Sequence, residues 1–263
     1  MLDRILAHKR AELARARAER PLEEVRAQAA DAPSPRDLVA ALLSPGPMPR
    51  PRIIAEIKRR SPSAGPLRPE ADAVEIAQRY MLAGAAAISV LTDEEFFGGS
   101  LGDLSAVRAG TRLPVLRKDF VLDVYEIWRA RAAGADAVLL IAAALEPSAL
   151  AELAAACRDL GMTALVEIHA ETELPAALDA KPQLVGINHR DLRTFAMDRE
   201  LFARLRPLVP AELPLVAESG IRTAEDVRRL GAAGAAAVLV GESLMRAPDP
   251  GEALRALLVG SDG

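Results

Sequence analysis

Eight short runs of β-branched and leucine residues alternate with alanine-rich stretches of helical period, from about residue 53 onward. This alternation is typical of successive βα units and a mostly parallel sheet. The runs lie near residues 53–58, 86–91, 114–119, 136–141, 163–168, 184–188, 214–218 and 236–241. A chain of 263 residues has the usual length of one closed α/β barrel. The pattern therefore predicts an α/β protein with the (β/α)8 TIM barrel fold.

Three strand entries nearly repeat one another, which supports a closed ring of similar units. They read "LAGAAAISVLT", "AAGADAVLLIA" and "GAAGAAAVLVG", with Gly84, Gly134 and Gly234 in matching places. Glycine at such a place fits the end of a helix before an incoming strand. The main competitor is a doubly wound open sheet, which normally carries a glycine-rich phosphate fingerprint after its first strand. The segment "KRRSPSAGP" is not such a fingerprint.

Residues 1–45 read as helical and precede the first predicted strand. The proline-rich segment "SPGPMPRPR" separates them from that strand and cannot continue a helix. We therefore expect one barrel domain over residues 1–263, in which residues 1–45 are an N-terminal helical extension that folds back over the barrel mouth.

Charge and cysteine content exclude several classes of protein. The net charge is −4 and acidic and basic residues are interleaved, so no basic stripe for nucleic acid or for anionic lipid is present. No segment has the roughly 18 consecutive apolar residues of a membrane span, and the first 20 residues lack a signal-peptide core. The single Cys157 leaves no internal disulfide and is expected in the core. These features predict a cytoplasmic protein.

The segment "IIAEIKRRSPSAG" places Glu56 and Lys58 in an apolar run that otherwise suits a buried strand. Of 33 basic residues only four are lysine, namely Lys9, Lys58, Lys118 and Lys181, so the chain builds its ordinary surface charge from arginine. A lysine in an apolar run is therefore a specific choice. For this pair alone, a structural ion pair is as good an interpretation as a functional one.

Charged or amide side chains stand at the C-terminal ends of five predicted strands. Residues two apart on a strand share a face, and active sites of such barrels collect at these ends. An apolar residue or glycine precedes nearly every one of them by two positions. The inward face of each strand is therefore apolar until its C-terminal end, where a charged or amide side chain stands. The residues are Glu56, Lys58, Lys118, Glu167, Asn188 and Glu218. Their convergence favours a catalytic site over isolated ion pairs.

The last two predicted strands end in "ESGI" and "LVGES", where small residues leave backbone N–H groups open. Barrels of this kind commonly bind a phosphate at this position, with backbone donors and the N-terminus of a short helix. A phosphorylated small molecule is therefore the expected substrate.

At these residues the chain resembles the indole-3-glycerol phosphate synthase family of tryptophan biosynthesis, and the likeness covers essentially all positions. The matching segments, in the family's order, are "IIAEIKRRSPSAG", "VLTDEEFFGGSLGDL", "PVLRKDFVLDVYEIWRARAAGADAVLLI", "LVEIH", "GINHRDLRTF", "LVAESGI" and "VLVGESLM". The resemblance implies a carboxy-lyase that closes the ring of 1-(2-carboxyphenylamino)-1-deoxyribulose 5-phosphate, with loss of carbon dioxide and water. It implies no metal or organic cofactor. We expect a monomer, although the sequence does not reveal the oligomeric state.

The resemblance also implies roles for single residues. Lys118 corresponds to the general acid that protonates the ketone oxygen, and Glu167 to its partner in proton transfer. A desolvated lysine is expected to give up a proton near neutral pH, which suits this task. Lys58, with Ser61 and Arg190, corresponds to the groups that face the anthranilate carboxylate, and Lys58 also to an acid that expels hydroxide.

Glu56 is expected to keep Lys58 charged and to take the proton lost when the ring becomes aromatic. Asn188 and Glu218 correspond to residues that hold the sugar hydroxyls and the proton network. Which carboxylate acts at which step stays open, because such groups titrate as a coupled set. Candidates to enclose the anthranilate ring are Phe96, Phe97 and Phe120, and those to bind the phosphate are Ser219, Gly220, Gly241, Glu242 and Ser243.

Two positions depart from the pattern of many bacterial members: Ala64 stands where "SPSKG" has lysine, and His189 where "INNRDL" has its second asparagine. His189 follows an inward-facing residue and is expected to point outward, and His8 and His169 are interpreted as structural or solvated. Two alternatives share the barrel: phosphoribosylanthranilate isomerase, expected to use a Cys and an Asp that these strand ends lack, and a non-catalytic sensor of a phosphorylated metabolite, which Lys118 and Glu167 argue against.

Overall fold

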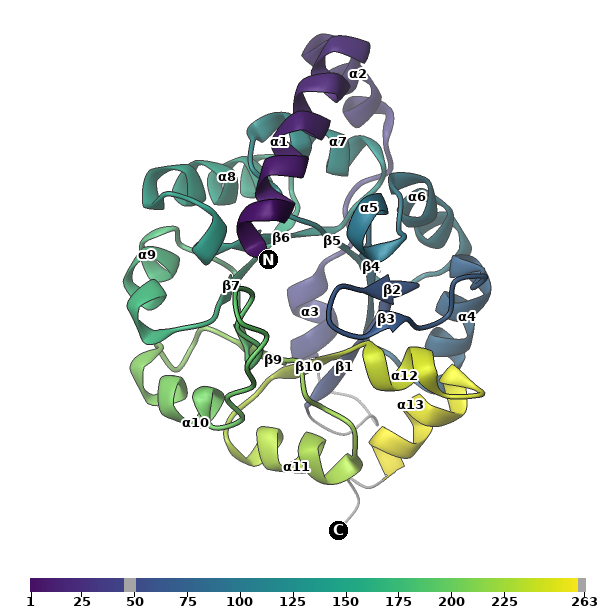
Figure 1. The fold of residues 1–263 in the computed structure, drawn as a ribbon, viewed down its shortest axis with the longest axis vertical. Helices are drawn as coiled ribbons and strands as arrows, with labels where there is room; N and C mark the ends of the chain where they lie inside the picture. Colours follow the sequence, from purple (N-terminus) through teal and green to yellow (C-terminus); the bar gives the residue numbers. More distant parts are fainter. Residues whose placement is uncertain (45–50, 260–263) are drawn as a thin grey trace.

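The computed structural model describes residues 1–44 and 51–259. Within them, eight parallel strands close into a barrel in the order β1, β10, β9, β8, β7, β6, β5, β4 (Figure 1). The strands are β1 (Arg52–Ile57), β4 (Ala87–Leu91), β5 (Val115–Lys118), β6 (Ala137–Ile141), β7 (Thr163–Ile168), β8 (Leu184–Asn188), β9 (Leu215–Glu218) and β10 (Ala237–Val240). Each lies within one residue of its predicted range. The predicted (β/α)8 TIM barrel is confirmed.

Helices follow the strands and surround the barrel as an outer ring (Figure 1). The longer ones are α4 (Ala73–Ala83), α6 (Leu101–Gly110), α7 (Val124–Ala132), α8 (Pro147–Asp159), α9 (Leu174–Asp179), α10 (Leu201–Leu205), α11 (Ala224–Ala232) and α13 (Pro250–Val259). Short pieces in the connections are α5 (Glu94–Phe97), α12 (Glu242–Arg246), η1 (Ala142–Ala144), η2 (Glu171–Glu173), η3 (Arg206–Leu208) and the hairpin β2 (Arg60–Ser61) and β3 (Gly65–Pro66).

Local sequence explains where these helices begin and end. Asp72 accepts hydrogen bonds from two backbone N–H groups at the start of α4, and Thr223 forms a capping box with Asp226 at the start of α11. Gly84 ends α4 with φ of 103°, a left-handed conformation that glycine adopts without steric cost. The repeated glycines of the sequence are thus helix ends before incoming strands, as predicted.

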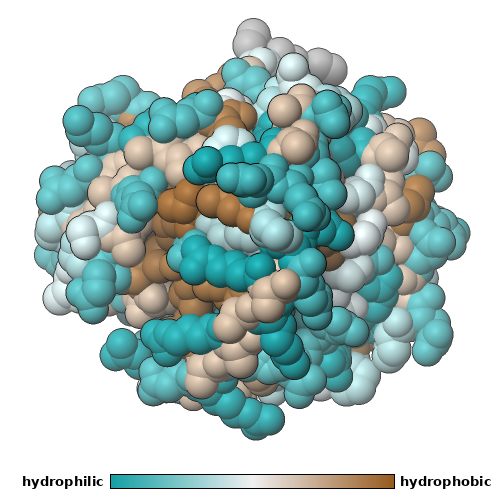
Figure 2. All heavy atoms as spheres, turned by 90° about the horizontal axis from the view of Figure 1, so that it is seen from above, coloured by the Kyte–Doolittle hydropathy of each residue, from teal (hydrophilic) through white to brown (hydrophobic). Residues whose placement is uncertain are grey.

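The barrel interior is a packed core built from alternate residues of the strands. Its middle contains Ile54, Leu116, Leu165 and Val216, each with no exposed surface. A second core lies between the strands and the outer helices and includes Cys157, so the expected core position of that residue is confirmed. On the face seen in Figure 2, hydrophilic residues surround a smaller apolar area in a central hollow.

Three helices precede the barrel: α1 (Leu2–Glu19), α2 (Leu22–Asp31) and α3 (Leu38–Leu43). They do not all cover the mouth. Leu38 and Leu42 of α3 are fully buried against the barrel interior together with residues that begin strands, so α3 closes the N-terminal end of the barrel. Only α1 reaches the C-terminal mouth, where Leu2 and Ile5 line the cavity described below.

Buried charges hold α1 against the barrel, in a group that we call the α1 clamp: Lys9, Glu12, Arg117, Asp119 and Glu126. Lys9 Nζ lies 2.9 Å from Asp119 Oδ1 and 2.7 Å from Glu12 Oε2. Arg117 donates to Asp119 at 2.9 Å and to Glu126 Oε1 at 3.3 Å. Burial would raise the pKa of Asp119, but the charges of Lys9 and Arg117 outweigh it and lower that pKa.

Two further observations concern the chain as a whole. The predicted proline-rich connector covers residues 44–52, and its residues 45–50 lie outside the described residues. In the described parts of the chain, no helix combines the length and apolar character needed to cross a membrane.

Candidate active site

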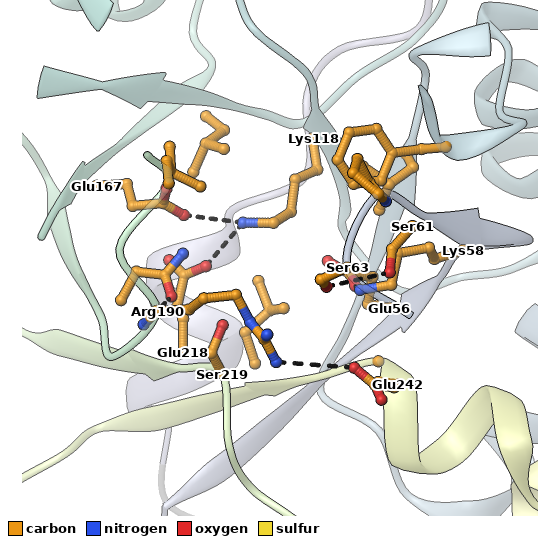
Figure 3. A pocket seen from close by; sticks show the side chains of 18 of the residues that line it. Glu56, Lys58, Ser61, Ser63, Lys118, Glu167, Arg190, Glu218, Ser219 and Glu242 are labelled. Carbon is orange, nitrogen blue, oxygen red and sulfur yellow. Dashed lines mark hydrogen bonds and ion pairs between the residues drawn. The ribbon is translucent and has the colours of Figure 1, made fainter. Parts of the chain in front are cut away.

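A cavity opens at the C-terminal end of the barrel and encloses about 1160 Å³ up to its open mouth. Every site residue predicted from the sequence lines this cavity except Phe96. Figure 3 shows these side chains pointing toward one another from different strands and loops. The inward alternation of the strands and the loops at their C-terminal ends together bring these residues to one cavity.

Lys118 stands between two carboxylates in this cavity. Its Nζ donates to Glu167 Oε2 at 2.9 Å and to Glu218 Oε2 at 2.7 Å (Figure 3). The three residues come from β5, β7 and β9, and both glutamates are only 1% exposed. Carboxylates this close to one ammonium group and to each other must share their charge and protons.

The environment separates the pKa values of these carboxylates. Burial and the nearby charge of Glu167 raise the pKa of Glu218 to about 8, against the charge of Lys118. Burial would raise the pKa of Glu167 too, but the positive charges of Lys118 and His169 lower it well below its usual value. The surroundings thus favour the ionised form of Glu167 and the protonated form of Glu218.

The expectation that burial brings the pKa of Lys118 toward neutrality is wrong. Burial does lower this pKa, but the negative charges of Glu167, Glu218 and Glu56 outweigh it and raise the pKa above the usual value for lysine. Lys118 is thus firmly protonated in the ligand-free site. Its acidity as a proton donor must come from a change in the charges around it.

Two glycines make room for the buried carboxylates. A Cβ at Gly186 would lie 2.3 Å from Glu218 Oε1, and one at Gly241 would lie 2.3 Å from Glu56 Oε1. Any side chain at these positions would displace the carboxylate. Gly186 was not among the predicted site residues, and its position two residues before Asn188 on the same face was the available signal.

Lys58 and Glu56 form an ion pair on the opposite side of the cavity from Glu167 (Figure 3). Lys58 Nζ lies 2.6 Å from Glu56 Oε1, so the predicted pairing is confirmed. The β2–β3 hairpin next to them brings Ser61, whose Oγ accepts the N–H of Ala64 at 3.1 Å and lies 3.5 Å from Ser63 Oγ. Ser63 also lines the cavity and was not predicted.

The loops after β9 and β10 have the open backbone expected of an anion site. Ser219 and Gly220 adopt left-handed φ values of 68° and 75°, and Gly241 directly precedes the short helix α12. The hydroxyl of Ser243 donates to the carbonyl of Ile221 at 3.1 Å and ties the two loops together. Successive N–H groups in such turns form a concave site for anions.

Arg190 approaches this turn. Its guanidinium extends toward Glu242, with Nη2 3.8 Å from Glu242 Oε2 (Figure 3). The backbone N–H of Arg190 donates to Asn188 Oδ1 at 3.0 Å, which orients the Asn188 amide. The sequence interpretation grouped Arg190 with Lys58, whereas its ion-pair partner in the structure belongs to the predicted phosphate turn.

The phenylalanines separate into two groups. Phe97 and Phe120 line the cavity with their ring centroids 6.3 Å apart. Phe96 instead packs under α1, where its ring meets His8 edge to face and lies below the guanidinium of Arg4. The one-residue difference between Phe96 and Phe97 on the short helix α5 sends them to different surroundings.

The histidines differ as well. His189 does not line the cavity, and its Nδ1 lies 3.0 Å from the carbonyl oxygen of Ser219, as an outward side chain allows. Burial lowers the pKa of His189. His169 was interpreted as structural or solvated, but it is not solvated: its side chain is 4% exposed and its Nε2 lies 3.1 Å from Glu167 Oε1. Its place two residues after Glu167 was the signal for this contact.

Among the described residues, no group of three or more His, Cys, Asp or Glu side chains is arranged to hold a metal ion. The cavity contains Lys118 in contact with two carboxylates, and a second cation, Lys58, paired with Glu56. The rings of Phe97 and Phe120 and the open backbone turn at Ser219 and Gly220 also line it. These features define the class: a (β/α)8-barrel enzyme equipped for proton transfer on a small anionic substrate.

Comparison with known proteins gives the family. The family model for indole-3-glycerol phosphate synthase matches residues 2–257. Enzymes of that name are 50% identical in Albidiferax ferrireducens, over 98% of this chain and 97% of the relative, and 48% identical in Mycobacterium tuberculosis, over 98% and 93%. Indole-3-glycerol phosphate synthase 2 of Streptomyces coelicolor is 51% identical, over 97% of both chains.

The chain belongs to the indole-3-glycerol phosphate synthase family, the carboxy-lyases of tryptophan biosynthesis. The resemblance noted in the sequence is thereby confirmed. Among solved structures, a thiamine phosphate pyrophosphorylase from Pyrococcus furiosus superposes with a TM-score of 0.63, over 86% of this chain and 98% of that chain. At 16% identity this likeness concerns the fold alone.

Proposed function

We propose that the protein converts 1-(2-carboxyphenylamino)-1-deoxyribulose 5-phosphate to indole-3-glycerol phosphate, with release of carbon dioxide and water. The observation that carries this proposal is Lys118, held between Glu167 and Glu218 in a cavity that also contains the Lys58–Glu56 pair. Ring closure needs an acid at the ketone oxygen, a second acid for the departing hydroxide and a base for the ring proton. Two lysines with carboxylate partners supply all three.

In this mechanism Lys118 donates its proton to the ketone oxygen as the ring carbon that carries the carboxylate attacks. Loss of carbon dioxide then restores the benzene ring, hydroxide leaves with a proton from Lys58, and Glu56 takes the proton whose loss makes the new five-membered ring aromatic. Glu167 exchanges protons with Lys118, and Asn188 and Glu218 hold the sugar hydroxyls. Positioned proton transfer of this kind contributes about 10²- to 10⁴-fold to a rate.

The substrate has an anionic group at each end, and the cavity offers a different kind of partner for each. We assign the carboxylate to Lys58, Ser61 and Arg190, and the aromatic ring to the space lined by Phe97 and Phe120. We assign the phosphate to the turn formed by Ser219, Gly220, Gly241, Glu242 and Ser243, chiefly through backbone N–H groups.

The experiment that tests the function is incubation of the protein with the synthetic ribulose phosphate while indole fluorescence is followed. We expect fluorescence to rise with release of one carbon dioxide per indole formed. Binding without turnover would identify a sensor instead. Conversion of phosphoribosylanthranilate would identify an isomerase. Turnover that persists after exhaustive treatment with a chelator would establish that no dissociable metal is required.

Three further features stay predictions from the sequence: a monomeric state, a cytoplasmic location and the absence of a nucleic-acid partner. Sedimentation of the purified protein at several concentrations measures the first.

A further inference from the structure

His169 reaches the proposed site from behind Glu167. It follows β7 directly and leaves the chain on the same face as Glu167, two residues earlier. The two oxygens of Glu167 therefore have different partners: Oε2 accepts from Lys118 at 2.9 Å, and Oε1 lies 3.1 Å from His169 Nε2. Glu167 is thus held between two cationic side chains.

Acidic groups surround His169 on three elements. Glu167 lies on β7, Glu173 ends η2 with its Oε2 3.7 Å from His169 Nδ1, and Asp191 follows β8, where the charge of His169 contributes to lowering the Asp191 pKa. A cation, Lys118, lies on the other side of Glu167, with its Nζ 2.9 Å from Glu167 Oε2. Burial lowers the pKa of His169, but Glu167 and Glu173 outweigh burial and raise it to about 10.

The contact acts through charge rather than through an aligned hydrogen bond. Among the described residues, neither ring nitrogen of His169 has a partner at hydrogen-bonding geometry, although Nε2 lies 3.1 Å and Nδ1 3.7 Å from a carboxylate oxygen. Glu218 has no corresponding cation: its Oε1 is buried and has no hydrogen-bond partner among the described residues. The two carboxylates that share Lys118 therefore differ in one respect, the imidazolium behind Glu167.

We propose that His169 is a positioning residue that decides which of the two carboxylates beside Lys118 carries a proton. Its positive charge keeps Glu167 ionised and leaves the proton on Glu218. The positive charge of His169 also offsets part of the negative charge that Glu167 presents to Lys118, which makes loss of the Lys118 proton to a substrate less costly. This distribution is a property of the free protein. Its consequence for rate rests on the proposed function.

The direct test is the protonation state of His169 in the intact protein. The chain has three histidines, so their imidazole NMR signals can be assigned by single substitutions. We expect the His169 ring to stay charged at pH 8, while that of His189 is neutral at pH 7. In Glu173→Gln the His169 ring should lose its proton at a lower pH. A neutral His169 ring at pH 7 in the unmodified protein would overturn the proposal.

The kinetic test compares the pH dependence of kcat/KM in His169→Gln and in the unmodified protein. Loss of the charge should move the acidic limb upward by about one pH unit or more, because an opposite charge at this distance typically shifts a carboxylate by 1–3 units. Activity should recover on the alkaline side of the shifted limb. Glu173→Gln removes a negative charge and leaves His169 charged at acidic pH, so it should not move the limb upward, and Glu171→Gln, an exposed neighbour on η2, should leave the limb unchanged.

A merely structural role gives a different result: an equal loss of kcat/KM at every pH with the limb unmoved. That outcome would refute the proposal. If His169→Gln does not fold, the NMR titrations of the unmodified protein and of Glu173→Gln still decide. Absence of any turnover in the unmodified protein would remove the proposed function, while the NMR titration would continue to decide the state of His169.

Discussion

The strand β5 carries two buried charge groups on its opposite faces, and they behave differently. Inward, Lys118 meets Glu167 and Glu218 at the edge of the cavity. Outward, Arg117 belongs to the α1 clamp and is 1% exposed. In the clamp, Arg117 uses its guanidinium on Thr92, Asp119 and Glu126 together.

The difference lies in what remains unpartnered. Of the clamp, Asp119 does line the cavity, but Lys9, Arg117 and the Thr92 hydroxyl already contact its carboxylate oxygens. At the mouth, a buried carboxylate oxygen of Glu218 has no hydrogen-bond partner within the described part of the chain, and burial with the charge of Glu167 raises the pKa of this carboxyl group. Buried charge alone therefore does not identify an active site. A buried charged group indicates an active site when one of its polar atoms lacks a partner and it lines a cavity.

The largest effect expected at the mouth is that of Lys118→Ala. The variant should fold and bind substrate but lose about 10²- to 10⁴-fold in kcat, because positioned proton transfer is lost. Turnover and substrate binding are measured separately, with circular dichroism to verify folding. The exposed Lys181 gives the matched control, since Lys181→Ala should keep normal kinetics. Near-normal turnover in Lys118→Ala would remove Lys118 from the mechanism.

The clamp should respond in the opposite way to loss of its lysine. Lys9→Met removes one of the two cations that Asp119 contacts and the cation beside Glu12. Breaking a buried pair typically costs about 3–5 kcal/mol of unfolding free energy, and the remaining Arg117–Asp119 contact places the expected loss toward the lower end of that range. We expect this loss in denaturant unfolding at neutral pH, with a much smaller fall in kcat than in Lys118→Ala. Lys181→Met is the control. If Lys9→Met were as stable as that control, the clamp would not hold α1 in place.

The smallest effect concerns Arg190, which connects the mouth to the predicted phosphate turn. Arg190→Met should weaken binding of the full substrate by about 1.5–3 kcal/mol, the worth of a charge-assisted hydrogen bond. Inorganic phosphate should compete almost as before if Arg190 serves the carboxylate. Titration at fixed moderate salt measures both, since screening acts over about 8 Å at physiological ionic strength. The exposed Arg193 in the same loop is the control.

A parallel fall in phosphate affinity would assign Arg190 to the phosphate pocket instead. Both assignments of Arg190, to the carboxylate or to the phosphate, are compatible with its contact with Glu242, because Glu242 begins α12 beside the proposed phosphate donors. Either result would distinguish Arg190 from Arg117 of the α1 clamp, which does not line the cavity.

Much of the barrel could be predicted from sequence because each strand is a short apolar run with a period of two. The same period placed Glu56, Lys118 and Glu167 on the inward face, where the structure has them. Composition held a further signal, since Lys9 is one of only four lysines and is buried in ion pairs like Lys58 and Lys118.

The other features of the site depend on how loops and neighbouring strands pack in three dimensions, which the sequence pattern does not show. The separation of Phe96 from Phe97 follows from the orientation of a four-residue helix. The charge of His169 depends on η2, which brings Glu173 back toward it. The raised pKa of Lys118 depends on distances to two other strands, and burial considered alone gave the wrong direction. The closure of the N-terminal end by α3 likewise needs the packed barrel.

Closure of the barrel has a consequence for synthesis of the chain. β1 pairs with β4 on one side and with β10 on the other, and β10 follows β1 by roughly 185 residues. At about 5–20 residues per second, a ribosome needs about 10–40 s to deliver β10 after β1 has emerged. During this interval the nascent chain has an open hydrogen-bonding edge on β1, the kind of edge that recruits other strands. The protein depends on that edge staying unoccupied until the last strand arrives.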